Sequence, residues 1–183
     1  MYNQPKKITR VVLIGGPASG KTSLINALID QGFTIHEEIS RTVTARAQEQ
    51  GIQQLFLEDP FAFSNELLSG RVRQYHGARS GINIYDRGIP DVPAYHIYSG
   101  DPIPGNYRQQ AVELRYDIVL YLPPWEEIYI QDSERYESWE QAQELGKVLY
   151  DYYQELDYRI IQVPTGTVEE RLSFVLKTIE ALD

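Results

Sequence analysis

The sequence predicts an α/β fold built on a parallel sheet of five strands. Short apolar runs alternate with longer segments of helical periodicity, which is the pattern of successive βαβ units. In addition, residues 15–22 read Gly-Gly-Pro-Ala-Ser-Gly-Lys-Thr, which fits the phosphate-loop pattern G-x-x-x-x-G-K-[ST] without a mismatch. Together these observations predict a three-layer α/β/α P-loop NTPase fold, organised as one domain over residues 1–183.

The individual elements are placed by their apolar patterns. Strands are expected at residues 8–14, 33–35, 82–85, 118–122 and 160–163. Helices are expected at residues 23–29, 39–50, 60–79 and 92–98, and again after the capping residues Ser138 and Thr167. Each of these two residues is followed three positions later by Gln141 or Glu170, which completes a capping box. The apolar residues after each box recur on one helix face, so both predicted helices pack against a core.

The composition excludes several classes of protein. The chain has 183 residues, of which 42% are apolar, and this is enough for one sizeable core. A net charge of −9 and the lack of a basic block argue against tight binding to nucleic acid. There is no cysteine, which excludes disulfides and thiol catalysis, and no apolar stretch approaches the length of a membrane span. We therefore expect a cytoplasmic protein, monomeric or homodimeric, that binds neither nucleic acid nor membranes.

The phosphate loop has a defined chemistry. Gly15 and Gly20 let the backbone curl so that successive N–H groups converge on phosphate oxygens, and the helix that follows adds its positive N-terminal end. Lys21 is placed to reach the β- and γ-phosphates, and the Thr22 hydroxyl is placed to ligate Mg²⁺. The residues predicted to bind the nucleotide are Gly15, Gly16, Pro17, Ala18, Ser19, Gly20, Lys21, Thr22 and Ser23. A glycine turn before a core helix would not explain why Lys and Thr follow directly.

The third predicted strand ends in an acid followed by an arginine. Ligands in open α/β sheets bind at the carboxyl ends of strands, so Asp86 is expected to face the phosphates. It could hold Mg²⁺ through water or accept a proton from a substrate hydroxyl, and Arg87 would point into the same crevice. The alternative is an Asp that only caps the next turn.

The second predicted strand leads into Glu37 and Glu38. An acid at this strand end is suitably placed for a general base, which makes Glu38 a catalytic candidate. The alternative is structural, with acids favoured in a first helical turn and Glu38 paired with Arg41 one turn away.

A long connection follows the fourth predicted strand. Residues 123–138 form an insertion of the kind that often serves as a lid in compact domains. Arg135 in this segment could act over the γ-phosphate as an arginine finger. Alternatively, Arg135 makes a surface pair with Glu134 or Glu137, which would contribute little.

With these residues assembled, the chain resembles a small bacterial family of P-loop proteins grouped as AAA-domain ATPases. That family is similar to the ribosylnicotinamide kinase domain of NadR-type proteins and to the eukaryotic TRPL translocation defect protein. The resemblance covers essentially the whole chain. It rests on GGPASGKT, on Glu38 to Arg41, on Tyr85-Asp86-Arg87-Gly88-Ile89-Pro90-Asp91, on Leu122 to Arg135, and on Val163-Pro164 with Val168 to Arg171.

The resemblance implies a nucleoside- or nucleotide-kinase-like fold with a mobile lid. By analogy, Glu38 resembles the catalytic acid after the second strand, Asp86 and Arg87 resemble the acid–arginine pair after the third, and Arg135 resembles a lid arginine. A ring-forming AAA motor would need an Asp-Glu pair where this chain has Asp86-Arg87. The resemblance to the ribosylnicotinamide kinase is distant at residues 52–79 and 89–110, so the family relation does not carry over the substrate.

Two functions are compatible with these residues. The first is a phosphotransferase that uses Mg-ATP, with GTP as another candidate, to phosphorylate a small hydroxyl acceptor. That acceptor would be nucleoside-like, and nicotinamide riboside is one candidate. The second is a regulatory ATP- or GTP-binding module with slow hydrolysis. A protein that served only as a scaffold would leave the phosphate loop unexplained. The residues expected to carry the chemistry are Lys21, Glu38, Asp86, Arg87 and Arg135, with Thr22 and Asp86 as the metal ligands.

Overall fold

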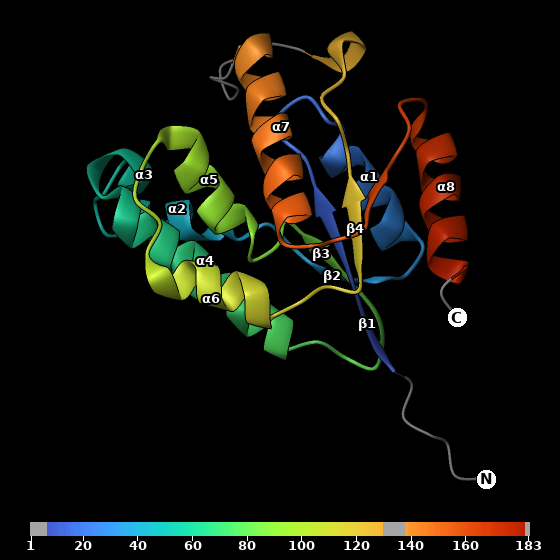
Figure 1. Ribbon diagram of the computed structural model, residues 1–183, viewed down its shortest axis with the longest axis horizontal. Helices are drawn as coiled ribbons and strands as arrows, with labels where there is room; N and C mark the ends of the chain where they lie inside the picture. The colour runs from blue at the N-terminus through green and yellow to red at the C-terminus, as the bar shows by residue number, and fades with distance from the viewer. Residues whose placement is uncertain (1–6, 130–137, 182–183) are drawn as a thin grey trace, which may run out of the picture.

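A five-stranded parallel sheet forms the centre of the fold. The computed structural model describes residues 7–129 and 138–181. The sheet has the strand order β2-β3-β1-β4-β5, and all four neighbouring pairs are parallel (Figure 1). This confirms the predicted α/β class and the predicted number of strands. The strands are β1 (Ile8–Ile14), β2 (Thr34–His36), β3 (Gly81–Asp86), β4 (Ile118–Tyr121) and β5 (Ile160–Gln162).

All of the predicted helices are present, with three further short elements. Both capping boxes form, at Ser138 and at Thr167. The α-helices are α1 (Lys21–Asp30), α2 (Ile39–Glu49), α3 (Leu55–Glu58), α4 (Pro60–His76), α5 (Asp91–Ser99), α6 (Gly105–Glu113), α7 (Trp139–Glu155) and α8 (Val168–Glu180), and a 3₁₀ turn, η1, covers Glu126–Ile128.

Sequence reasoning missed α3, α6 and η1, which all have weak apolar patterns. In α6, only Tyr107 and Ala111 are buried, and in α3 and η1 no residue is buried. Stripes this narrow, in elements this short, do not stand out as helical periodicity.

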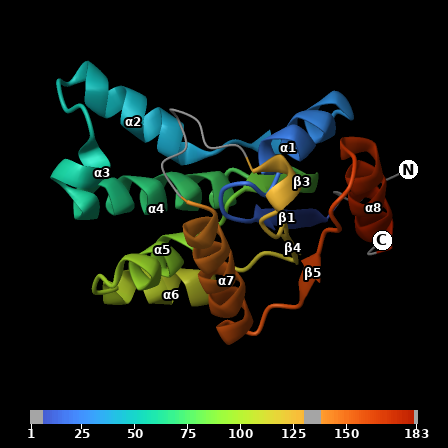
Figure 2. The same cartoon turned by 90° about the horizontal axis from the view of Figure 1, so that it is seen from above.

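Helices cover both faces of the sheet, so the fold has the predicted three layers. Alternate residues of β1 point to opposite faces, as the pleat of a strand requires. Val11 and Leu13 pack against α1 and α8, whereas Val12 and Ile14 face the aromatic cluster that contains Tyr153 of α7. All of these β1 residues have no exposed surface. Figure 2 shows α1 and α8 on one side of the sheet and α7 on the other.

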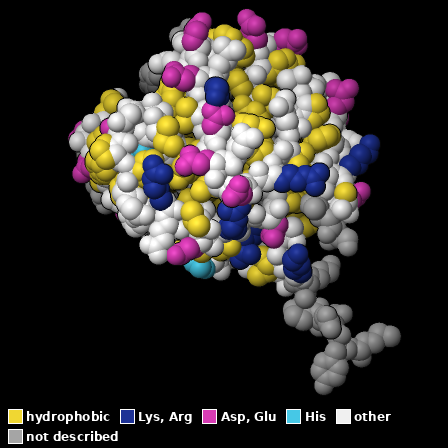
Figure 3. Space-filling model, viewed as in Figure 1, with side chains coloured by type: hydrophobic (Ala, Val, Ile, Leu, Met, Phe, Trp, Pro, Cys, Tyr) yellow, Lys and Arg dark blue, Asp and Glu magenta, His cyan; other side chains and the backbone are white. Residues whose placement is uncertain are grey.

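Helices α4, α5 and α6 form a helical region beside the sheet. Their contact is centred on Leu68, Ile89 and Tyr107, and the C-terminal half of α5 packs against α7. Figure 2 shows α2, α3 and α4 extending away from the sheet on this side. On the face seen in Figure 3, acidic and basic side chains are interspersed. Within residues 7–129 and 138–181, no helix combines the length and the apolarity that crossing a membrane would require.

The strand register brings the predicted site residues to one edge of the sheet. Leu13 of β1 lies opposite Asp86 of β3, and Tyr85 of β3 lies opposite His36 of β2. Parallel strands share one carboxyl edge, so the loops after β1, β2 and β3 all begin there. This edge therefore carries the phosphate loop, Glu38 and the Asp86-Arg87 pair together.

Helix α1 allows a matched test of this core. Leu28 has no exposed surface, whereas the neighbouring Ile29 is 44% exposed. Leu28→Ala should lower the free energy of unfolding by about 2–5 kcal/mol, because it removes buried methyl groups and leaves a cavity. Ile29→Ala should change it by less than about 1 kcal/mol. Denaturant unfolding of both variants measures the difference, and equal losses would contradict this assignment of the core.

Candidate active site

The loop between β1 and α1 has the conformation of an anion-binding turn. Gly20 adopts φ = 67° and serves as the N-cap of α1. A Cβ at Gly15 would lie 2.5 Å from the carbonyl oxygen of Leu122, so this position accepts only glycine. Lys21 is buried at the start of α1, while Thr22 and Ser23 are exposed at its first turn. The N-terminal end of α1 thus opens toward solvent, where its free N–H groups can meet an anion.

A pocket of about 570 Å³ lies over this loop. Residues 16–23 form its floor, and Arg41 and Arg87 supply positive charge. The backbone N–H of Trp125 donates to the carbonyl of Ala18 at 2.8 Å, which joins the loop to the segment after β4. The remaining wall consists of Trp125, Ile128, Gly166, Thr167, Val168 and Arg171.

Arg171 of α8 holds the phosphate loop in place through hydrogen bonds to its carbonyl groups. Its side chain is 4% exposed, and its Nη2 donates to the carbonyl oxygen of Ser19 at 2.8 Å. Its Nη1 donates to the carbonyl of Gly20 at 3.5 Å. These bonds hold two carbonyls toward α8, which leaves the amides of the loop free to face an anion. Sequence reasoning assigned no role to Arg171, because the contact joins residues 151 and 152 positions apart.

Lys21 and Asp86 form an ion pair at the carboxyl edge of the sheet. Their side chains are 9% and 12% exposed. Burial and the nearby charge of Arg87 lower the pKa of Lys21, while Asp86 and Glu38 oppose this shift. The structure therefore places the predicted phosphate-binding lysine directly against the predicted metal ligand.

Glu38 lies in a buried cluster with two arginines. Its carboxylate pairs with Arg87 through one oxygen and with Arg71 at 3.3 Å through the other. Burial alone would raise the pKa of Glu38, but the charges of Arg87, Arg71 and Lys21 outweigh it and lower the pKa to about 2. Arg41, the alternative partner considered from the sequence, is exposed one turn further along α2.

Arg71 is a site residue that the sequence did not reveal. Its side chain is 3% exposed, and its Nη1 donates to the carbonyl of Gly88 at 3.0 Å. It comes from α4, 33 residues after Glu38, so no local pattern links the two.

Asp91 lies beside Arg87 and holds the turn that contains it. Its Oδ2 accepts from the backbone N–H of Gly88 at 2.9 Å and from the Tyr153 hydroxyl at 2.6 Å. Its Oδ1 lies 3.9 Å from Nη1 of Arg87, and the same Nη1 donates to the Tyr95 hydroxyl at 2.8 Å. The backbone of Arg87 has φ = 72°, a left-handed conformation that costs a non-glycine residue free energy. The buried Asp91 offsets this cost by holding the turn together.

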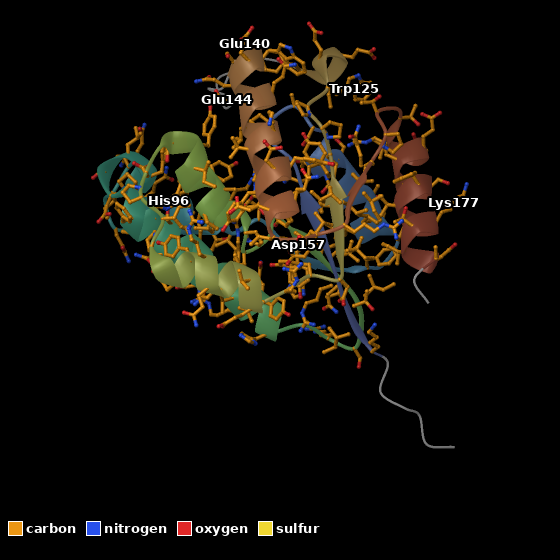
Figure 4. The ribbon with its side chains drawn as sticks, viewed as in Figure 1. His96, Trp125, Glu140, Glu144, Asp157 and Lys177 are labelled. Atoms are coloured by element: carbon orange, nitrogen blue, oxygen red, sulfur yellow. The ribbon has the colours of Figure 1, made fainter. Side chains whose placement is uncertain are left out.

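A second pocket, of about 430 Å³, adjoins the first. Its walls are mainly aromatic and apolar, and Glu38, Arg71 and Arg87 lie in its lining. Arg87 lines both pockets. In Figure 4, Trp125 of the first pocket and His96 of the second lie on opposite sides of α7.

The donor set near the phosphate loop suits a hard cation such as Mg²⁺. The Thr22 hydroxyl is exposed at the first turn of α1, and the carboxylate of Asp86 ends β3. Mg²⁺ takes oxygen ligands and is usually held by one or two protein groups together with substrate phosphates. Residues 7–129 and 138–181 contain no group of three or more His, Cys, Asp or Glu side chains that could hold a metal ion by themselves.

Arg135 and most of the predicted lid at 123–138 lie outside the described residues. Of that segment, the structure shows Pro123 to Tyr129, including η1, and Ser138.

Solved structures of similar fold include two kinases and the NadR protein. A deoxyadenosine kinase from M. mycoides gives a TM-score of 0.68 at 16% identity, over 96% of this chain and 100% of the other. NadR in complex with NR gives 0.66 at 19% identity, over 95% of this chain. This chain spans about half of NadR, 51% of its length. Thymidylate kinase from Candida albicans gives 0.62 at 16% identity, over 96% of this chain and 92% of the other.

A family comparison identifies the chain more directly. The sequence matches the family model described as "AAA domain" over residues 10–171, so the chain belongs to this family. No curated protein gives a significant sequence match. Further structures of similar fold hold dATP, in the deoxyadenosine kinase, and AMP-PNP, in NadR.

Arg171 offers a test of how the phosphate loop is held. Arg171→Met keeps most of the apolar stem but removes the bonds to the Ser19 and Gly20 carbonyls. The affinity for ATP should fall about tenfold, because hydrogen bonds to a charged group contribute about 1.5–3 kcal/mol. Calorimetric titration measures the change, with Arg159→Met, at an exposed arginine outside both pockets, as the matched control. The same affinity in both variants would remove the anchoring role.

Glu38 should make stability depend on pH. Its folded-state pKa of about 2 lies below the ordinary value of 4.5, so its ionised form stabilises the fold above pH 4.5. This contribution is lost as the pH falls from 4.5 through about 2. Denaturant unfolding across this range should therefore show a shallower loss of stability for Glu38→Gln than for the parent chain. Parallel pH profiles for the two would show that the carboxylate is not held in this ionised state.

Proposed function

We propose that this member of the AAA domain family transfers the γ-phosphoryl group of ATP to a hydroxyl group of a small, nucleoside-like acceptor. The observation that carries the proposal is the presence of two adjoining pockets with Arg87 in the lining of both. One pocket has the phosphate loop as its floor, and the other contains a buried carboxylate. An enzyme that only hydrolyses a nucleotide needs the first pocket alone.

The charges of the site are arranged for phosphoryl transfer. The loop amides and Lys21 would hold the β- and γ-phosphates. Arg87 would neutralise the negative charge on the phosphoryl group as it is transferred from one pocket to the other. Because phosphoryl transfer needs little covalent chemistry from the protein, such positioning supplies most of the rate enhancement.

Glu38 is proposed to receive the acceptor's proton. Its pKa of about 2 keeps it ionised, and it lines the second pocket beside Arg87. In a loose transition state the attacking hydroxyl keeps its proton until late, so a weakly basic carboxylate can orient the hydroxyl and take the proton at the end. Asp86 is the other carboxylate at this edge, but it is paired with Lys21.

Thr22 and Asp86 are the residues that would hold Mg²⁺. When bound, the cation would neutralise charge on the phosphates. If Lys21 turned toward the phosphates as a nucleotide entered, the Asp86 carboxylate would be released from its ion pair and free to face the metal. Arg135 stays a proposed finger, on the strength of its place in the sequence after β4.

The competing function is a regulatory module that hydrolyses ATP or GTP slowly. Such a module would use the phosphate loop, but the second pocket and the position of Glu38 within it would have no function.

The deoxyadenosine kinase and NadR structures that hold dATP and AMP-PNP support ATP as the donor.

Transfer from γ-labelled ATP to a nucleoside panel tests the proposal. Label should appear in an acceptor, and Glu38→Gln should lower the turnover about 10²–10⁴-fold, the usual contribution of a general base. The affinity of this variant for ATP should change much less than the turnover, since Glu38 does not line the phosphate-loop pocket itself.

Lys21→Ala is the comparison variant, because it should weaken ATP binding itself. If label appears only as free phosphate, at a slow rate that no acceptor changes, the regulatory module replaces the kinase. If Glu38→Gln transfers label as fast as the parent chain, Glu38 is not the base.

A further inference from the structure

The second pocket has two chemically different ends. Helices α4 and α5 run antiparallel along it, because Arg71 near the end of α4 contacts Gly88 just before α5, while Ser64 near the start of α4 contacts His96. The end beside Glu38 carries two arginines and is where transfer is proposed. The far end carries Ser64, Ser99 and Asp101 in its lining.

The proton of the Ser64 hydroxyl is already used within the protein. Nδ1 of His96 lies 3.0 Å from the carbonyl oxygen of Pro102, which can only accept, so Nδ1 carries a hydrogen. The His96 side chain is 4% exposed and packs against the rings of Phe61 and Tyr107, and it forms no salt bridge within the described residues. With its hydrogen on Nδ1, the neutral ring offers Nε2 as an acceptor. Ser64, 3.1 Å from Nε2, therefore donates to it and offers the pocket only lone pairs.

Two further side chains in the lining at this end, Ser99 and Asp101, also offer acceptors. The Ser99 hydroxyl donates to Asp101 Oδ2 at 2.6 Å, so its single hydrogen is used as well. The carboxylate of Asp101 has no hydrogen to give. Ser64, Ser99 and Asp101 thus all present oxygen lone pairs, and no side-chain donor stands among them.

We propose that the far end of this pocket selects a nucleoside whose base edge carries an N–H donor, as an amino or carboxamide group does, and rejects one that carries a carboxylate. This inference rests on the proposed function, which places the acceptor in this pocket. Oxygen atoms without hydrogens to share bind N–H groups well. They leave a carbonyl or carboxylate unpaired, and Asp101 adds repulsion against a negative charge.

The dimensions and walls of the pocket support this orientation. Helix α5 separates the two ends by about 12 Å, its length at 1.5 Å per residue. This is comparable to the span of a nucleoside from its 5′ hydroxyl to the far edge of its base. The side walls include Phe56, Phe63, Tyr95 and Tyr98, whose rings suit a planar base.

Matched nucleosides that differ at one group test the inference. The probes are adenosine against purine riboside, which lacks the amino group, and nicotinamide riboside against nicotinic acid riboside, which replaces the carboxamide by a carboxylate. Calorimetric titration into the full chain should show about tenfold tighter binding of the donor-bearing member of each pair. This readout does not depend on turnover.

Two substitutions locate the effect at the far end. Ser64→Ala should reduce the preference within each pair at least threefold, whereas Ser69→Ala, at an exposed serine on the same helix outside both pockets, should leave it unchanged. Asp101→Asn should narrow the gap between carboxamide and carboxylate, because it removes the repulsion and supplies a donor. Asp30→Asn, at the exposed last residue of α1, is its matched control.

The outcomes separate this inference from the proposed function. Donor preference in binding without label transfer from ATP would support the inference and overturn the kinase. Transfer to both members of a pair with equal affinity would support the kinase and overturn the inference. Binding of neither nucleoside would overturn the inference, and a preference unchanged by Ser64→Ala and Asp101→Asn would do the same.

Discussion

The balance of buried charge at the carboxyl edge of the sheet is the constraint on which the rest of the site depends. Three cations, Lys21, Arg71 and Arg87, face three carboxylates, Glu38, Asp86 and Asp91, and each cation is close to at least one carboxylate. Removing one partner would leave an uncompensated buried charge, which is far more costly than the pair itself is stabilising. The cluster joins α1, the start of α2, α4, β3 and α5, so the same ion pairs fix both the local fold and the shape of the two pockets.

This balance would also let the proposed site accept a polyphosphate without rearranging its framework. An anion arriving at the phosphate loop can draw Lys21 away from Asp86, and a divalent cation arriving with it can replace the lysine beside that carboxylate. The Glu38–Arg87 pair, by contrast, is held from several sides by Arg71, Asp91 and Tyr95. One ion pair is thus exchangeable, and the other is part of a rigid support, which suits a site that positions two reactants.

Local patterns predicted the parts of this structure that local physics determines. The apolar run at 8–14 is the strand β1 residue for residue, and both capping boxes form where Ser-x-x-Gln and Thr-x-x-Glu occur. The placement of Glu38, Asp86 and Arg87 at one edge followed from strand ends in a parallel sheet, although their roles remain proposals. Arg71 and Arg171 could not be found in this way, because each acts on a segment that lies far away in the sequence and is brought near only by packing.

The regions that sequence reasoning described least well are those that shape the proposed acceptor pocket. The neighbouring kinases share the fold at 16–19% identity, and a sheet with a phosphate loop tolerates such divergence because its core needs only apolar residues of suitable size. Helices α3 and α6, which lack a clear apolar stripe, adjoin the helices that line the pocket. The selectivity proposed there depends on which atoms hold a hydrogen, as in the His96–Ser64 bond. A single bond of this kind leaves no periodic pattern in the sequence. The fold and the donor site can therefore persist while the acceptor changes, so the acceptor must be inferred from the polarity of the pocket rather than from the family.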